Sequence, residues 1–180
     1  MLKVDTTSPS TKFPPAFRDR YIIRCIDEDF GLSSKQNPMI TLSFEICGHQ
    51  GADGKLSQTI KRGGTEYMIA GKKCSPMYFT LIDGFAGQNY LEFRQKAKLE
   101  VPEEGINPEN PPLDHKGIVL SAILSVQESI QRKALTDEEK TAGKQVGDPI
   151  TDENGKQVIN YRINIDQILG KSSVEINTPF

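Results

Sequence analysis

Tryptophan is absent from this sequence of 180 residues, cysteine and histidine are scarce, and no long apolar run occurs. A helix that crosses a membrane needs roughly 20 consecutive apolar residues, so we expect no membrane partner. The N-terminus also lacks the apolar core of a secretory signal. The three cysteines are odd in number and predict no disulfide framework, which fits a reducing compartment. These absences together predict a cytoplasmic protein.

Recognisable catalytic motifs are missing as well. The sequence contains no Walker-type phosphate loop, no Gly-x-Gly-x-x-Gly and no Gly-x-Ser-x-Gly. Neither of the two histidines, His49 and His115, lies in a known motif. We therefore predict that the protein is not an enzyme and that it holds no cofactor.

Two clusters of residues leave a metal site open. The consecutive carboxylates of Asp27–Asp29 would suit a divalent cation, but a solvated loop at a strand end is the favoured interpretation. Cys47 and His49, together with Cys25 and Cys74, are zinc-type ligands, but they lack the paired Cys-x-x-Cys spacing of structural zinc sites. Buried thiols are favoured there, and we predict no metal.

The charge is distributed unevenly along the chain. Residues 11–101 hold 13 Lys and Arg against 10 Asp and Glu, whereas residues 102–180 hold 8 against 13. A basic body followed by an acidic remainder is typical of nucleic-acid-binding proteins. An imbalance of this size also arises often by chance.

Alternation of apolar and polar residues is clearest between residues 40 and 46. Ile40, Leu42, Phe44 and Ile46 are apolar and the residues between them are polar, which predicts a strand that buries these four side chains. Content of β-branched and aromatic residues predicts further strands at 21–26, 56–62, 67–69, 77–82, 117–126 and 159–165. Turn-forming residues separate them at 31–38, 51–54, 63–64 and 154–155.

Helical signals are few. The sequence from Asn89 to Glu92 has the form of a capping box and predicts a short helix over residues 93–99. Thr136–Glu139 resembles a second helix start within a polar segment. Four prolines make residues 101–113 a connection.

Five to six strands, one short helix between the middle and late strands and a long insertion predict a mainly β fold. The order favours a small Greek-key, OB-like barrel, and a general β-sandwich stays open as an alternative. We expect three parts: a flexible N-terminal arm over residues 1–17, the barrel domain over 18–170 with an insertion around 127–157, and a C-terminal tail over 171–180.

Cations and aromatic rings are interleaved in the first and middle strands. Proteins bind single-stranded nucleic acid by pairing phosphates with Lys and Arg and by stacking bases on aromatic rings. A solvated sheet face with half-buried rings would show the same composition, and both interpretations stay open. The predicted nucleic-acid-binding residues are Arg18, Arg20, Tyr21, Arg24, Lys61, Arg62, Tyr67, Lys72, Lys73, Tyr78 and Phe79.

Residues 21–46 resemble the opening of bacteriophage OB-fold proteins of the single-stranded DNA-binding type. In that family a strand, a turn of the form Ser-Lys-x-Gly/Asn-x-Pro/Met and an alternating strand begin the barrel, as Tyr21–Arg24, Ser33–Met39 and Ile40–Ile46 do here. The order of the later segments is similar, so the resemblance covers Tyr21 to Leu169. It implies a non-catalytic protein that binds single-stranded DNA in phage-type replication or recombination, in the host cytoplasm.

The chain ends in Pro179-Phe180. Single-stranded DNA-binding proteins of bacteria and phages often close an acidic tail with these two residues, so the resemblance implies that Pro179 and Phe180 contact replication or recombination proteins. Packing of this tail onto the barrel or onto a sister subunit is the alternative.

A second class of function also stays open, a virion or accessory β-protein that acts through protein–protein contacts. The sequence does not determine the oligomeric state, and a homo-oligomer stays open. It also does not determine the host or the preference for DNA or RNA.

Overall fold

The structure is a computed structural model that describes residues 9–10, 18–174 and 176. Most of the expected N-terminal arm lies outside these residues, as do Pro179 and Phe180 of the expected tail. The chain divides into two compact units. Unit 1 comprises Met1–Ser125 and Ile163–Phe180, and unit 2 comprises Val126–Arg162.

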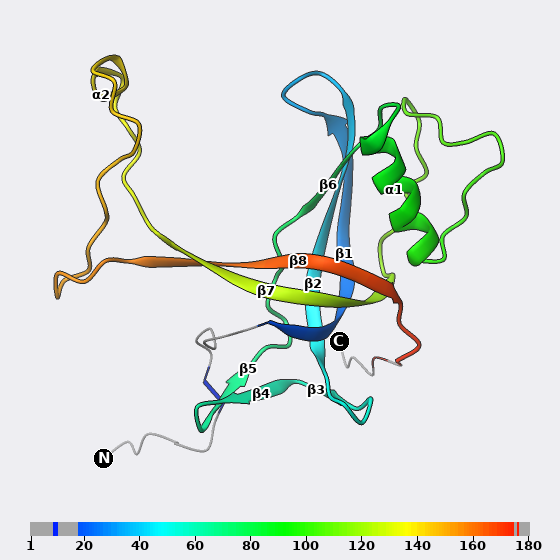
Figure 1. Ribbon diagram of the computed structural model, residues 1–180, viewed down its shortest axis with the longest axis horizontal. Helices are drawn as coiled ribbons and strands as arrows, with labels where there is room; N and C mark the ends of the chain where they lie inside the picture. The colour runs from blue at the N-terminus through cyan, green and yellow to red at the C-terminus, as the bar shows by residue number, and fades with distance from the viewer. Residues whose placement is uncertain (1–8, 11–17, 175, 177–180) are drawn as a thin grey trace. The chain divides into compact units, whose positions relative to one another are not determined.

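The main sheet has six strands in the order β3-β2-β1-β7-β8, with β6 paired to β2. Figure 1 shows β7 and β8 crossing the long pair of β1 and β2. A separate two-stranded sheet pairs β4 with β5. The strand bounds are β1 (Asp19–Leu32), β2 (Pro38–Gln50), β3 (Leu56–Ser57), β4 (Thr59–Arg62), β5 (Thr65–Met68), β6 (Met77–Thr80), β7 (Val119–Ile130) and β8 (Ile159–Lys171).

The strand connections follow the order of a partly open Greek-key barrel, which confirms the OB-like class. β1 pairs antiparallel with both β2 and β7, and β2 pairs antiparallel with β6. The segment before β6 reaches β8 where the Ser75 N–H donates to the Ile163 carbonyl over 2.7 Å. No strand ladder joins β6 to β8 in the described part of the chain, so the sheet is not closed.

The core contains the face of β2 that the alternating pattern predicts. Ile40, Leu42 and Phe44 are 0% exposed and Ile46 is 1% exposed, which confirms the register. The long strand β1 supplies Ile22 and Ile23, which are both fully buried although neighbours on a strand point to opposite faces. Both faces of β1 are therefore covered at this point.

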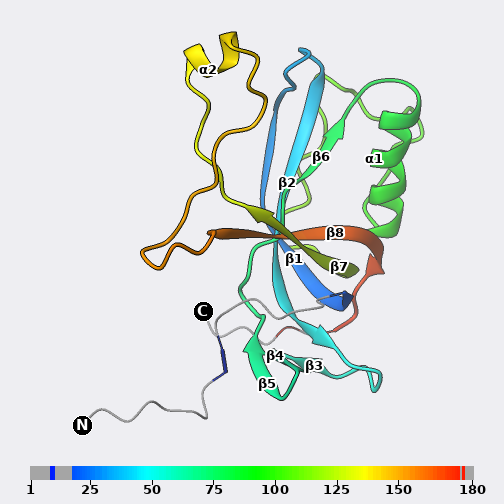
Figure 2. The same cartoon turned by 60° about the vertical axis from the view of Figure 1, so that its left-hand side comes forward.

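Helix α1 (Phe85–Lys96) lies alongside β6, between the middle and late strands as expected (Figures 1 and 2). The predicted capping box at Asn89–Glu92 is wrong, because Asn89 lies within the helix and is exposed. The helix begins after Gly84, whose φ of 89° is in the left-handed region that glycine tolerates, and no side chain caps it. Exposed positions within a helix accept the same polar residues as a cap. The Asn89–Glu92 pattern therefore placed the start of the helix too late.

Unit 2 contains a second helix, α2 (Asp137–Thr141), so the prediction of a single helix is too low. The helix start at Thr136 is confirmed: Thr136 Oγ1 accepts the Glu139 N–H, and the Glu139 carboxylate accepts the Thr136 N–H. The turn at 154–155 is also confirmed, since Gly155 has a φ of 75°. No helix in the described part of the chain has the length and apolar character of a membrane span.

Candidate nucleic-acid interface

Three of the predicted site residues lie along β2: Arg24 on the neighbouring β1, Tyr78 on the neighbouring β6, and Lys73 in the segment before β6. Arg24 lies opposite Glu45 in the register and its guanidinium pairs with that carboxylate. Lys73 lies opposite Glu45 on the other side, through an isolated bridge. Tyr78 lies opposite Thr41 and is 62% exposed, so its ring is available for stacking. Among the described residues, this surface therefore holds one cation, Arg24, that pairs with a carboxylate, one exposed cation, Lys73, that forms no ion pair, and one exposed ring, Tyr78.

A second group of predicted residues lies where β1 begins. Asp19 accepts a hydrogen bond from Arg62 over 3.5 Å and lies 2.9 Å from His49 Nε2. Burial alone would raise the pKa of Asp19, but the Arg20 N–H, His49 and Arg62 outweigh it and lower the pKa. The ionised Asp19 therefore positions the His49 and Arg62 side chains and neutralises part of the charge of Arg62.

Arg20, the next residue of β1 after Asp19, lines two neighbouring concavities. The first, of about 310 Å³, is lined by Arg20, Gln50, Ser121, Leu169, Gly170, Lys171, Ser172, Ser173 and Val174, so no carboxylate of a described residue lies in its wall. The second, of about 520 Å³, shares Arg20 and Gln50 and continues along Asp19, His49 and the turn at 51–54. We call the first concavity the Arg20 groove.

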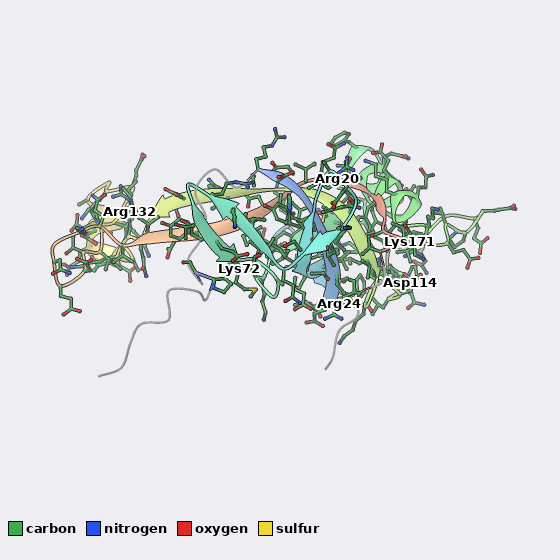
Figure 3. The ribbon with its side chains drawn as sticks, turned by 90° about the horizontal axis from the view of Figure 1, so that it is seen from below. Arg20, Arg24, Lys72, Asp114, Arg132 and Lys171 are labelled. Atoms are coloured by element: carbon green, nitrogen blue, oxygen red, sulfur yellow. The ribbon has the colours of Figure 1, made fainter. Side chains whose placement is uncertain are left out.

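The Arg20 groove contains two cations without an acidic partner among the described residues. The side chains of Arg20 and Lys171, which come from β1 and β8 and are labelled in Figure 3, make no ion pair and are exposed. Hydroxyl groups of Ser121, Ser172 and Ser173 line the same groove. Two positive charges with hydrogen-bond donors and no carboxylate suit an anionic group such as a phosphate.

Two predicted stacking residues are corrected, because their rings are buried. Tyr21 is 0% exposed and its ring contacts His49 edge-on, with 5.2 Å between ring centroids. Phe79 is 7% exposed because it lies opposite Ile40, on the core face of β6, where its ring packs 4.9 Å from that of Phe93. Neither ring can present its face to a base.

The remaining predicted residues are dispersed. Arg18 is exposed and pairs with Asp166 over 3.3 Å. Lys61 and Tyr67 lie on the β4–β5 hairpin, where Lys61 is exposed opposite Glu66 and Tyr67 is half-buried. Lys72 is half-buried, and this burial lowers its pKa. The structure therefore does not bring the predicted cations together into one continuous face.

A buried polar network around Arg94 was not predicted from the sequence. Arg94 is 1% exposed; its Nη1 and Nη2 donate to the Asp114 carboxylate over 2.7 and 2.8 Å, and its Nε and Nη2 donate to the Glu100 carbonyl over 2.9 and 2.7 Å. Nη1 also donates to the Tyr90 hydroxyl over 3.2 Å. These bonds lower the pKa of Asp114, and they outweigh the effect of burial so that the pKa of Arg94 is raised. The signal in the sequence was slight: an arginine four residues after a tyrosine on one helix.

The network continues from Tyr90 to β1. The Tyr90 hydroxyl lies 3.0 Å from His115 Nε2, and Glu28 Oε2 lies 2.8 Å from His115 Nδ1. A hydroxyl, an imidazole and a carboxylate in this order match the arrangement of an acyl-transfer triad. His115 is 0% exposed and Tyr90 is 1% exposed, so both side chains are buried. The network ties α1 to β1.

The cysteines contribute no candidate site. Cys25 and Cys74 are buried, Cys47 is half-buried, and all three are free thiols. Within the described ranges, no three His, Cys, Asp or Glu side chains are arranged to hold a metal ion. Asp27 is exposed and forms a long ion pair of 3.9 Å with Lys116.

Comparison with known proteins gives no relative. No family model matches the sequence, and no curated protein matches it. The resemblance to phage single-stranded DNA-binding proteins therefore stays a prediction.

Proposed function

We propose that this protein binds single-stranded DNA without catalysis, with the phosphate backbone in the Arg20 groove. The observation that carries the proposal is the pair Arg20 and Lys171: neither forms an ion pair with any described residue, and no described carboxylate lines their groove on the OB-like sheet. Single-stranded nucleic acid is held by such cations at its phosphates. Participation in phage-type replication or recombination is part of the same proposal and rests on the sequence resemblance.

Tyr78 supplies the second element of the proposal. OB-folds bind oligonucleotides on the face of their second and third strands, and β2 and β6 occupy these places in the barrel order. Tyr78 projects its exposed ring from β6 on the outer side, away from the core residues Ile40 and Phe79. A base stacked on this ring would contribute about 1–3 kcal/mol.

The test is fluorescence anisotropy with a labelled oligo-dT over a salt series, using the full chain. For single strands, the slope of log K against log salt is about −0.7 per neutralised phosphate. Arg20→Ala and Lys171→Ala should each reduce the slope by about that amount, because each removes one phosphate contact. Lys156→Ala is the matched control, since Lys156 is also exposed and forms no ion pair with any described residue, but it lies in unit 2.

The outcomes separate the site from the function. Binding of oligo-dT with unchanged slopes in Arg20→Ala and Lys171→Ala would keep DNA binding and remove the Arg20 groove from it. No binding at low salt would contradict the proposal itself and favour a protein-binding accessory role. A parallel titration with oligo-rU measures the preference between DNA and RNA.

A further inference from the structure

A pocket of about 300 Å³ lies between α1 and the loop that follows it. Apolar side chains line it from the end of β6, from α1 and from the loop, namely Leu81, Ile82, Leu91, Ile106 and Pro108. The carboxylates of Asp83 and Glu104 lie in the same wall, and no Lys or Arg does. We call this the α1 pocket.

The surface beside the α1 pocket carries large apolar side chains that are exposed to solvent. Phe85, the first residue of α1, is 83% exposed, more than any other large hydrophobic side chain in the described residues. Ile82, in the pocket wall, is 41% exposed. Exposed apolar side chains around a concavity mark a surface that is covered by a partner.

The charge of this surface is negative and uncompensated. Asp83, Glu103, Glu104 and Glu109 form no ion pair with any described residue. A nucleic acid would be repelled here, because its phosphates carry the same sign of charge. A partner with Lys or Arg beside an apolar side chain would satisfy both features.

The pocket is also held in place from within. Arg94 fixes both ends of the loop to α1, since it donates to the Glu100 carbonyl at the start and to Asp114 at the end. Within the loop, the Gly105 N–H donates to the Pro102 carbonyl over 2.9 Å. A wall that is already ordered costs little entropy when a partner binds.

From this combination we propose that the α1 pocket binds a segment of another protein that inserts an apolar side chain and carries Lys or Arg on either side of it. Charge complementarity selects this occupant over a nucleic acid and over an acidic peptide. The site is separate from the Arg20 groove and does not depend on DNA binding.

The test uses two synthetic peptides with the full chain, measured by fluorescence anisotropy. The probe is a labelled KRLFRK peptide, and the control is KRSSRK, which has the same charge but no apolar anchor. The probe should bind at least about tenfold more tightly than KRSSRK, because burial of one apolar side chain stabilises a complex by about that factor. Equal affinity for the two peptides would overturn the proposal, since it would show attraction by charge alone.

Variants locate the site. Phe85→Ser should reduce the preference for the probe, and Glu104→Lys should weaken both peptides by at least about fivefold because it reverses a charge in the pocket wall. Val146→Ser and Glu153→Lys are the matched controls; Val146 is 55% exposed and Glu153 is exposed, and both lie in unit 2. Thermal melts check that each variant folds. If Glu104→Lys does not fold, Phe85→Ser alone still tests the pocket.

Two further results would overturn the proposal. One is probe binding that neither Phe85→Ser nor Glu104→Lys changes. The other is self-association in sedimentation velocity that Phe85→Ser abolishes, because a second copy of the chain would then occupy the pocket.

Discussion

Replacing Arg94 by methionine should be among the most damaging single changes in unit 1. The substitution keeps a long side chain but removes every donor to the Glu100 carbonyl and the Asp114 carboxylate. Removal of one partner of a buried ion pair lowers the free energy of unfolding by about 3–5 kcal/mol. Asp114 has a side chain that is 42% exposed and regains water, so we expect the low end, about 3 kcal/mol.

The assay is urea unfolding followed by circular dichroism at neutral pH. Lys96→Met is the control on the same helix, since Lys96 is exposed and forms no ion pair with the residues that the structure describes; it should change the free energy of unfolding by less than about 0.5 kcal/mol. Arg94→Lys should fall between the two, because an ammonium group cannot reproduce the paired geometry of the guanidinium. An Arg94→Met variant within about 0.5 kcal/mol of the wild type would refute the reasoning.

The same variant has a defined pH dependence. The hydrogen bonds from Arg94 lower the pKa of Asp114 below its ordinary value of 3.8. A folded-state pKa below the unfolded one stabilises the protein above the unfolded value, and this contribution is lost as the pH falls through the folded pKa. The difference in stability between wild type and Arg94→Met should therefore shrink below about pH 4. A difference that grows in acid would contradict this assignment.

Three more predictions depend on which side chains are buried and which are exposed. Phe44→Ala should lower the free energy of unfolding by about 3–5 kcal/mol, because Phe44 is 0% exposed, and a loss under about 1 kcal/mol in urea unfolding would contradict the register of β2. Tyr78→Ala should weaken oligo-dT binding by about 1–3 kcal/mol with an unchanged salt slope, since stacking releases no counterions; a changed slope would count against stacking. Burial raises the pKa of Cys47 to about 11 and that of Cys74 to about 12, so Ellman's reagent at pH 8 should label the native protein slowly and the urea-unfolded protein at once. Equally fast labelling of the native thiols would contradict their burial.

The parts of this protein that the sequence predicted well are those that depend on neighbours along the chain. Alternation alone identified the buried face of β2, because side chains on a strand point to opposite faces in turn. The capping box at Thr136 involves a backbone group only three residues away, so it could be recognised without knowledge of the fold. The Greek-key class followed from the number and order of such local segments.

The candidate site was predicted less well, because it depends on which strands pair and in which register. Phe79 and Tyr78 are adjacent and both aromatic, yet pairing with Ile40 buries the first while pairing with Thr41 exposes the second. Lys171 joins Arg20 in one groove only because β8 returns to the sheet that contains β1.

The Arg94 network shows the same limit in the core. Arg94 reaches Asp114 across 20 positions of sequence, and His115 reaches Glu28 across 87. The sequence by itself determined the local periodicities, turns and caps. Only the tertiary structure decided which cations are neutralised, which rings are exposed and which polar groups are buried together, because these properties depend on contacts between segments that are distant in the chain.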